Sequence, residues 1–296
     1  MVGSGITRRL KAKGYEHVQE LHRAEADLTD CTAVERWFAD NKPEYVFLAA
    51  AKVGGVLAND QFSGEFIRDN LLIQTHVIDA AHRHGAKKLL FLGSSCIYPK
   101  HAAQPMTEDC LLTGTLEETN KAYAVAKIAG ITMLQAYTKQ YGFQGISLMP
   151  TNLYGPGDNF DLETSHVLPA MIRKFHDAKE SGAPTVTLWG SGTPKREFLH
   201  VEDLADASVF LMENYDSPEI INVGTGKDIS IADLASLIRE TVGYRGDVVY
   251  DATKPDGTPR KWLDTSKLTA LGWEPKTGLR EGIASTLAWY VNNVES

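Results

Sequence analysis

Short apolar, β-rich runs alternate with longer amphipathic stretches over the first half of the chain. The apolar runs predict strands at His17 to Leu21, Tyr45 to Ala49, Lys88 to Leu92 and Gly145 to Met149. The intervening segments have helical periodicity and predict helices over Thr32 to Asp40, Glu65 to His84 and Asn120 to Tyr141. Such alternation is typical of parallel βαβ units. We therefore expect an α/β fold built on a Rossmann-like, doubly wound parallel sheet.

A passage rich in Gly, Pro and Asn, TNLYGPGDNF, follows the strand that ends near Met149 and marks a change of pattern. We predict a Rossmann-like domain over residues 1–152 and a smaller α/β region over residues 153–296, from which a segment can return to the first sheet. This second region should face the carboxyl edge of the sheet, where open α/β folds bind ligands. Its predicted helices are Val167 to Lys179, Val201 to Asn214, Ile231 to Val242 and Gly278 to Asn293, and its predicted strands are Thr185 to Trp189, Ile220 to Val223 and Asp247 to Tyr250.

The start of the chain carries only part of a dinucleotide-binding fingerprint. Such a fold normally opens with a strand and a glycine-rich loop that leads into a helix, whose N-terminus holds the pyrophosphate. Here MVGSG supplies Gly3 as a candidate last glycine and Ser4 to Lys13 as the helix after it, with no strand before them. A flexible terminus and an N-terminally shortened cofactor loop both remain open.

The composition of the chain argues against nucleic acid, a membrane or a metal ion as its partner. The net charge of -8 argues against nucleic acid as the main partner, because phosphate binding needs a basic surface. No apolar run approaches the ~18 residues that span a bilayer. The three cysteines Cys31, Cys96 and Cys110 have no C-x-x-C spacing, so neither a disulfide framework nor a metal site is indicated. We expect a cytoplasmic protein with no metal and no membrane partner.

The strongest chemical pattern is formed by Ser94, Tyr123 and Lys127. Ser94 ends the strand KLLFLGSS, and the other two lie four residues apart on the helix NKAYAVAKIAG, which puts the phenol and the ammonium on one face. We expect the ammonium to lower the pKa of the phenol, so that Tyr123 exchanges a proton with a carbonyl or hydroxyl oxygen that Ser94 also contacts. A Y-x-x-x-K spacing alone is common on ordinary helices.

Longer blocks make the pattern specific. They are LAAAKVGG, KLLFLGSSCIYPK, YAVAKIAG, MPTNLYGPGDNF, SHVLPA, WGSGTPKREFLHVEDLADA and KPDGTPRK, and they cover both halves of the chain. With these blocks the sequence resembles the extended short-chain dehydrogenase/reductases, and within them the GDP-L-fucose synthase family. The resemblance implies that GDP-4-dehydro-6-deoxy-D-mannose is epimerised at C3 and C5 and then reduced at C4 by NADPH to GDP-L-fucose.

That chemistry needs more than the Ser/Tyr/Lys set. The C4 ketone acidifies the protons on both flanking carbons, so one group must remove each proton and another must return it. Cys96 and His166 match the family positions for this exchange, and their ordinary pKa values bracket neutral pH. Which of them is acid and which is base stays open.

The resemblance also implies binding residues. Arg23 follows the predicted second strand, where an arginine suits the 2′-phosphate of NADP. The full cofactor set is Gly3, Arg23, Asp27, Leu28, Leu92, Gly93, Ser94, Ser95, Lys127, Pro150, Thr151, Asn152, Leu153 and His166. The sugar nucleotide is assigned to Lys174, Trp189, Arg196 and Asp256, since cations suit a diphosphate and an aromatic ring can pack on a sugar or base.

Two other functions compete with this one. A 4-epimerase or 4,6-dehydratase of the same superfamily keeps the Tyr/Lys pair, but it places other residues at Cys96 or needs no Cys/His pair. A non-catalytic nucleotide-sugar-binding protein is the second alternative. The family also implies a homodimer that pairs through two helices, and Phe66, Ile67, Leu71, Ile73, Ile78, Ile128, Ile131, Met133 and Leu134 make these helices more apolar than one buried face requires.

Overall fold

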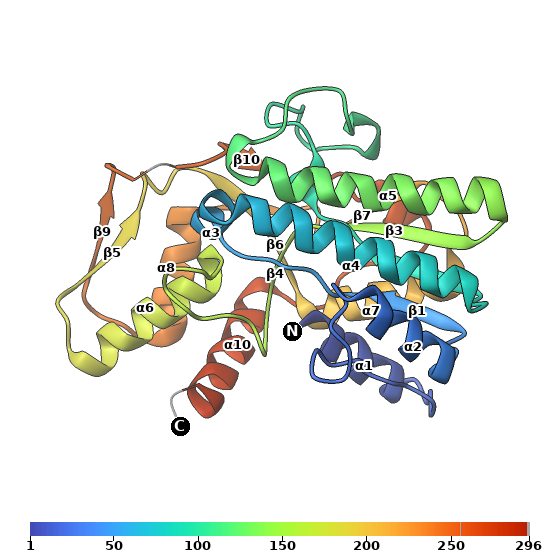
Figure 1. Cartoon of the computed structure of the whole chain (residues 1–296). Coiled ribbons are helices and arrows are strands. Elements are labelled where there is room, and N and C mark those ends of the chain that lie inside the picture. Colours follow the sequence, from blue (N-terminus) through green and yellow to red (C-terminus); the bar gives the residue numbers. More distant parts are fainter. Residues whose placement is uncertain (255, 295–296) are drawn as a thin grey trace.

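A four-stranded parallel sheet forms the centre of the computed structural model, which describes residues 1–254 and 256–294 (Figure 1). Its order is β1-β2-β3-β7, and the strands are β1 (Tyr45–Leu48), β2 (Lys88–Leu92), β3 (Gln144–Pro150) and β7 (Ile220–Val223). All five residues of β2 are buried, as a strand covered on both faces should be. Strand β7 comes from the second half of the chain and returns to this sheet.

Helices cover both faces of the sheet, which confirms the doubly wound fold. Helices α4 (Ser63–Arg83) and α5 (Lys121–Tyr141) pack side by side on one face, with α2 (Cys31–Asn41) against α4 (Figure 1). On the other face, α7 (Val201–Asn214) contacts β2 and β3, and α1 (Val2–Ala12) packs on α7.

The predicted strand at His17 to Leu21 is wrong, because this segment has no regular structure. An apolar run becomes a strand only when a neighbouring strand accepts and donates its main-chain hydrogen bonds. In the described part of the chain β1 is an end strand of the sheet, and its one partner is β2. Residues 17–21 therefore lie in an irregular loop that leads to Arg23.

The second region carries two smaller sheets. One has the order β10-β6-β4, with β8 (Asp228–Ser230) antiparallel to β6; its other strands are β4 (Asn152–Tyr154), β6 (Lys195–His200) and β10 (Arg260–Lys261). The other pairs β5 (Thr185–Trp189) with β9 (Asp247–Asp251). Its helices are α6 (Val167–Ser181), α8 (Ile231–Val242) and α10 (Leu279–Asn293). The short elements complete the fold: α3 (Val56–Gln61), α9 (Ser266–Ala270), and the 3-10 turns η1 (Ser95–Ile97), η2 (Glu108–Cys110) and η3 (Glu118–Asn120).

Separate apolar cores support the sheet and the second region. One core lies between the sheet and α4 and α5, and another joins α6, α8 and α10 around Tyr154 and Phe175. Strands β2 and β3 end at the same edge of the sheet, and residues 93–96 and 151–154 follow them there. Among the described residues, no helix is long and apolar enough to cross a membrane.

Candidate active site

The end of β2 places Ser94 and Cys96 together. The Ser94 hydroxyl oxygen accepts the Cys96 N–H at 3.2 Å and so caps the short turn η1. Just before it, the Gly93 N–H donates to the Leu148 carbonyl at 2.8 Å, and a Cβ at Gly93 would lie 2.4 Å from the Met149 side chain. A side chain at position 93 would displace the Met149 side chain, so the lack of a Cβ at Gly93 permits this close approach beside Ser94.

Helix α5 brings Tyr123 and Lys127 to the same place. Tyr123 lies near enough to Ser94 for the serine hydroxyl to act on the pKa of the phenol. The Lys127 Nζ donates to the Leu92 carbonyl at 2.7 Å and lies 4.6 Å from the Phe91 ring centroid. Lys127 is 3% exposed, and burial lowers its pKa to about 7.

The expected effect of Lys127 on Tyr123 is wrong. Burial raises the pKa of the Tyr123 phenol, the nearby Cys96 charge raises it further, and the Ser94 hydrogen bond lowers it only in part. The Lys127 Nζ lies 5.8 Å from the Tyr123 ring centroid, and its hydrogen bond goes to Leu92. Tyr123 is therefore protonated at neutral pH, which suits a proton donor to a carbonyl oxygen.

Lys261, at the end of β10, is a site residue that the sequence analysis did not single out. Its Nζ lies 3.2 Å from the Cys96 Sγ. Burial raises the pKa of this thiol, but the Lys261 charge, the hydrogen bonds with Ser94 and Lys261, and the Arg196 charge outweigh burial and lower it. The only available signal was the position of Lys261 at the end of the KPDGTPRK block.

His166 lies at the N-terminus of α6 and belongs to the same cluster. Burial lowers the pKa of its imidazole, and the charge of Lys261 lowers it further. The charge of Lys261 therefore affects the pKa of both Cys96 and His166, and the pairing of these two residues for proton exchange stays a prediction.

The residues predicted to bind the sugar nucleotide come from different elements: Arg196 from β6, Lys174 from α6, Trp189 from the end of β5 and Asp256 from the loop before β10. Burial lowers the pKa of Arg196, and the nearby charges of Cys96 and Asp256 oppose that shift. Asp256 accepts the Ser191 N–H at 2.6 Å and the Ser191 hydroxyl at 2.8 Å. Gly190, at φ +78°, permits this approach, because a Cβ there would lie 2.3 Å from the Asp256 Oδ1.

The Trp189 ring is exposed and lies between two lysine side chains. The Nζ atoms of Lys174 and Lys254 are each 5.6 Å from its ring centroid. Trp189 is 48% exposed, unlike a core residue, and burial lowers the pKa of Lys174. An exposed ring between two cations suits a base or sugar that carries phosphate. Lys254 was not predicted, and residue 255 after it lies outside the described residues.

The predicted cofactor residues fit a phosphorylated dinucleotide by the chemistry of their donors. Gly3 lies in the first turn of α1, where backbone N–H groups lack intrahelical acceptors, and its nearest neighbour for an added Cβ is 4.0 Å away. The Arg23 side chain is 86% exposed and lies 3.2 Å from Asp27. Lys127 supplies a third donor at the sheet edge.

The other predicted cofactor residues have mainly structural contacts in this structure. Leu28 packs against the first core, and Ser95 is buried. Pro150 ends β3, and the Thr151 and Asn152 side chains both donate to the Glu197 carbonyl, at 3.2 and 2.8 Å. Leu153 lies in β4 beside these residues. Their role toward a cofactor stays a prediction.

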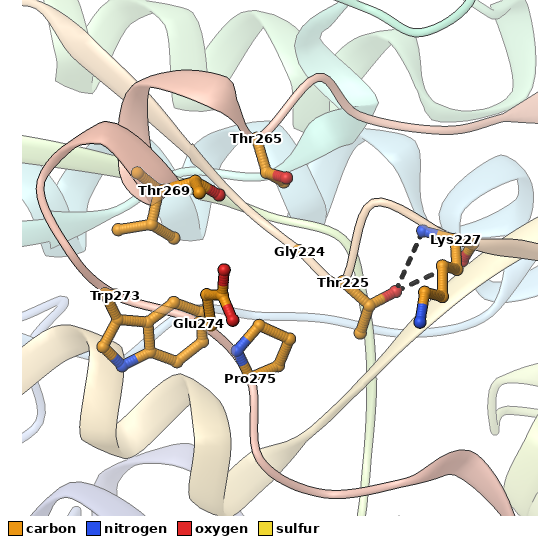
Figure 2. A pocket seen from close by; sticks show the side chains of 9 residues that line it. Gly224, Thr225, Lys227, Thr265, Thr269, Trp273, Glu274 and Pro275 are labelled. Atoms are coloured by element: carbon orange, nitrogen blue, oxygen red, sulfur yellow. Dashed lines mark hydrogen bonds between the residues drawn. The ribbon is translucent and has the colours of Figure 1, made fainter.

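A pocket of about 260 Å³ lies beyond the end of β7 (Figure 2). Thr225, Lys227, Thr265, Trp273 and Glu274 are among the residues that line it. The Thr225 hydroxyl accepts the Lys227 N–H at 3.3 Å and donates to the Lys227 carbonyl at 3.2 Å. None of the predicted site residues lines this pocket.

Comparison with known proteins agrees with this geometry. Residues 1–224 match the model of the NAD dependent epimerase/dehydratase family. GDP-L-fucose synthase 1 of Arabidopsis thaliana is 56% identical, over 99% of this chain and 91% of that protein, and GDP-L-fucose synthase of Escherichia coli is 52% identical, over 99% and 94%. A solved GDP-L-fucose synthetase from Naegleria fowleri bound to NADP has a TM-score of 0.92 at 29% identity, covering 100% of this chain and 92% of that one. The chain therefore belongs to the NAD dependent epimerase/dehydratase family, together with these GDP-L-fucose synthases.

Proposed function

We propose that this chain converts GDP-4-dehydro-6-deoxy-D-mannose to GDP-L-fucose with NADPH, by epimerisation at C3 and C5 and then reduction at C4. The observation that carries the proposal is the meeting of two sets of groups at one sheet edge. Ser94, Tyr123 and Lys127 suit carbonyl reduction, and Cys96 lies two residues from Ser94 beside Lys261. A simple 4-epimerase does not need the second set, so the alternatives are not favoured.

In the first stage the keto-sugar must lose and regain protons on the carbons beside C4. Cys96 and His166 are the proton-exchange pair: one takes the proton from carbon, and the other returns a proton to the opposite face. The electron pair left on carbon moves to the C4 oxygen, where the Ser94 and Tyr123 hydroxyls stabilise the enolate by hydrogen bonding. No net proton is gained or lost.

In the second stage Tyr123 gives its proton to the C4 oxygen, and its raised pKa keeps that proton in place until then. NADPH, when bound, supplies the hydride that reduces C4. The α1 N-terminus and Arg23 hold the phosphates of this cofactor in the proposed complex, and Lys127 contacts its ribose. Arg196 and Lys174 hold the GDP diphosphate, with Trp189 against the base or sugar.

Two finer points belong to the same proposal. The three cysteines of the chain are all free, which fits the reducing cytoplasm as the site of action.

We also propose that the active chain forms a homodimer through α4 and α5. Phe66, Ile78, Ile131 and Leu134 are buried inside the chain, and Ile128 packs against its core. The support for that surface is therefore the half-buried Leu71 and the exposed Val125.

The test is direct incubation of the chain with NADPH and the keto-sugar. We expect loss of NADPH absorbance and formation of GDP-L-fucose, identified by its chromatographic retention and NMR spectrum. Loss of water from, or C4 inversion of, a nucleotide sugar without net NADPH oxidation would indicate a dehydratase or 4-epimerase. Binding of the keto-sugar with no turnover would indicate a non-catalytic binding protein.

A further inference from the structure

We propose that Lys261 is a positioning residue for the epimerisation stage: its ammonium holds the Cys96 sulfur as an anion and fixes its direction toward the sugar. The inference rests on the proposed function for its sugar chemistry, but the contact itself is independent of any substrate. The Lys261 Nζ lies 3.2 Å from the Cys96 Sγ, within reach of a charge-assisted hydrogen bond to sulfur.

The backbone around Lys261 is held by strand β6 on one side and by the loop at residues 104–106. Strand β10 pairs with β6 so that Lys261 lies opposite Arg196. The next residue, Trp262, donates its N–H to the Gln104 side chain at 2.9 Å and accepts the Met106 N–H at 2.8 Å. A lysine has many rotamers, but a fixed backbone limits where its ammonium can lie.

Glu197 provides the second anchor for the same segment. Its carboxylate accepts the Leu263 N–H at 2.9 Å, the Thr225 N–H at 2.6 Å and the Gly226 N–H at 2.8 Å. Glu197 is fully buried, so these bonds join β6 to the segment after β10 in the interior. The ladder and the carboxylate together keep Lys261 beside Cys96, although 165 residues separate the two along the chain.

The charges around Cys96 explain why one lysine can decide its ionisation. The titratable and charged groups that act on the sulfur or respond to its charge are Lys261 from β10, Arg196 from β6 and the protonated Tyr123 from α5. The charge of Lys261 also reaches His166 at the α6 N-terminus. Burial alone opposes the anion. Within the described part of the chain, Lys261 makes no ion pair with a carboxylate, so its charge is not neutralised by an acidic partner.

The competing role for Lys261 is that of a simple ligand for the substrate diphosphate. Both roles predict a weaker enzyme when the lysine is lost, so activity alone does not separate them. The ionisation of Cys96 in the absence of substrate does, because a lysine that turns away from the sulfur and serves only the diphosphate would leave it unchanged.

The experiment measures the alkylation rate of Cys96 by iodoacetamide against pH, without substrate. Peptide mass spectrometry separates Cys96 from Cys31 and Cys110. We expect Lys261→Met to raise the pH midpoint of alkylation by about 1 unit or more, the usual effect of one close opposite charge. Lys261→Arg should restore most of the shift, and the matched control Lys195→Met, from the facing strand of the same ladder, should leave the midpoint in place.

A second measurement follows deuterium incorporation at C3 and C5 of the keto-sugar. In Lys261→Met we expect it to fall at least ~10-fold near pH 7, with kcat affected more than KM, and to recover as the pH is raised. An unchanged alkylation midpoint with a raised KM would overturn the inference and make Lys261 a diphosphate ligand. A shifted midpoint in a protein whose wild type exchanges no sugar protons would instead overturn the proposed function.

Discussion

Burial decides the protonation of the central site residues as much as their neighbours do. Tyr123 and Lys127 are four residues apart, and a simple charge argument predicts a lowered phenol pKa. In the structure the phenol pKa is raised and the lysine pKa is lowered, since burial disfavours both charged forms. The result is a protonated donor beside an amine that titrates near neutral pH.

The first prediction concerns stability and Lys127. Its pKa of about 7 in the folded chain lies below the ordinary value of 10.5, so between these values the unfolded chain binds more protons. The free energy of unfolding should therefore rise with pH across this window, by up to about 1.4 kcal/mol per unit, and this contribution is lost as the pH falls through 7. Denaturant titrations of wild type and Lys127→Met at pH values from 7 to 9 should show a difference that grows in favour of wild type. The exposed Lys139→Met is the control. A difference that is independent of pH would contradict the assignment.

The second prediction separates the two stages of the reaction by residue. Tyr123→Phe removes the proton donor and should lower NADPH oxidation by ~10²-fold or more. Cys96→Ser or His166→Asn should instead suppress deuterium incorporation at C3 or C5, because proton exchange on these carbons needs acid and base groups other than the Tyr123 hydroxyl. Near-normal oxidation by Tyr123→Phe, or normal exchange by both other variants, would remove those residues from their roles.

Candidate site residues can be predicted from the sequence when their spacing lies within one element or when their motif is long. Ser94, Tyr123 and Lys127 were found because a strand end and an i,i+4 helix pair are local patterns. Lys261 was missed because a lone lysine on a two-residue strand has no local signal, and its importance comes from a ladder with β6. The contact to Cys96 depends on tertiary structure alone.

A helix or strand can be predicted from the sequence when it is long enough to show a periodic pattern and, for a strand, when a neighbouring strand is present to pair with it. The segments 88–92, 185–189, 201–214, 220–223 and 231–242 have the predicted bounds, because each carries a clear period or a continuous buried run. Strands β4, β8 and β10 are two or three residues long and too short to show alternation. The run at residues 17–21 has a strand-like pattern but no strand beside it.

The third prediction tests the close packing of α4 on α5. Gly130 lies where a Cβ would be 2.7 Å from both the Gln74 side chain and Phe91, and Gln74 donates to the Ala126 carbonyl at 2.6 Å. Gly130→Ala should therefore destabilise the protein by about 1–3 kcal/mol, although alanine is the better helix former. Gly64→Ala, in α4 with no atom within 4 Å of its added Cβ, is the matched control and should be neutral or mildly stabilising. Equal denaturation midpoints for the two variants would show that the helices can move apart without cost.

The main sheet and the second region are joined by strands that pass from one to the other. Strand β7 returns to the main sheet, β4 continues from β3 into the second sheet, and Glu197 ties β6 to the segments after β7 and β10. Ser94 and Tyr123 come from the first region, and Arg196 and Lys261 come from the second. The site therefore exists only in the assembled fold, and the division at residue 152 stays a prediction about the sequence.

The last prediction is that two copies associate through α4 and α5. These helices lie side by side on one face of the sheet (Figure 1), and along α5 the residues Val125, Ile128, Thr132 and Ala136 form an uncharged, half-buried or exposed face. Pairing two such faces of α5 removes apolar surface from water. Light scattering at micromolar concentration should give twice the chain mass of 32.5 kDa, and Ile128→Glu should give the single mass, because a carboxylate would be buried in the interface. Lys139→Ala, in the last turn of α5, should leave the dimer intact and controls for changes to the helix itself. A wild-type chain that scatters only as 32.5 kDa would rule out this interface under those conditions.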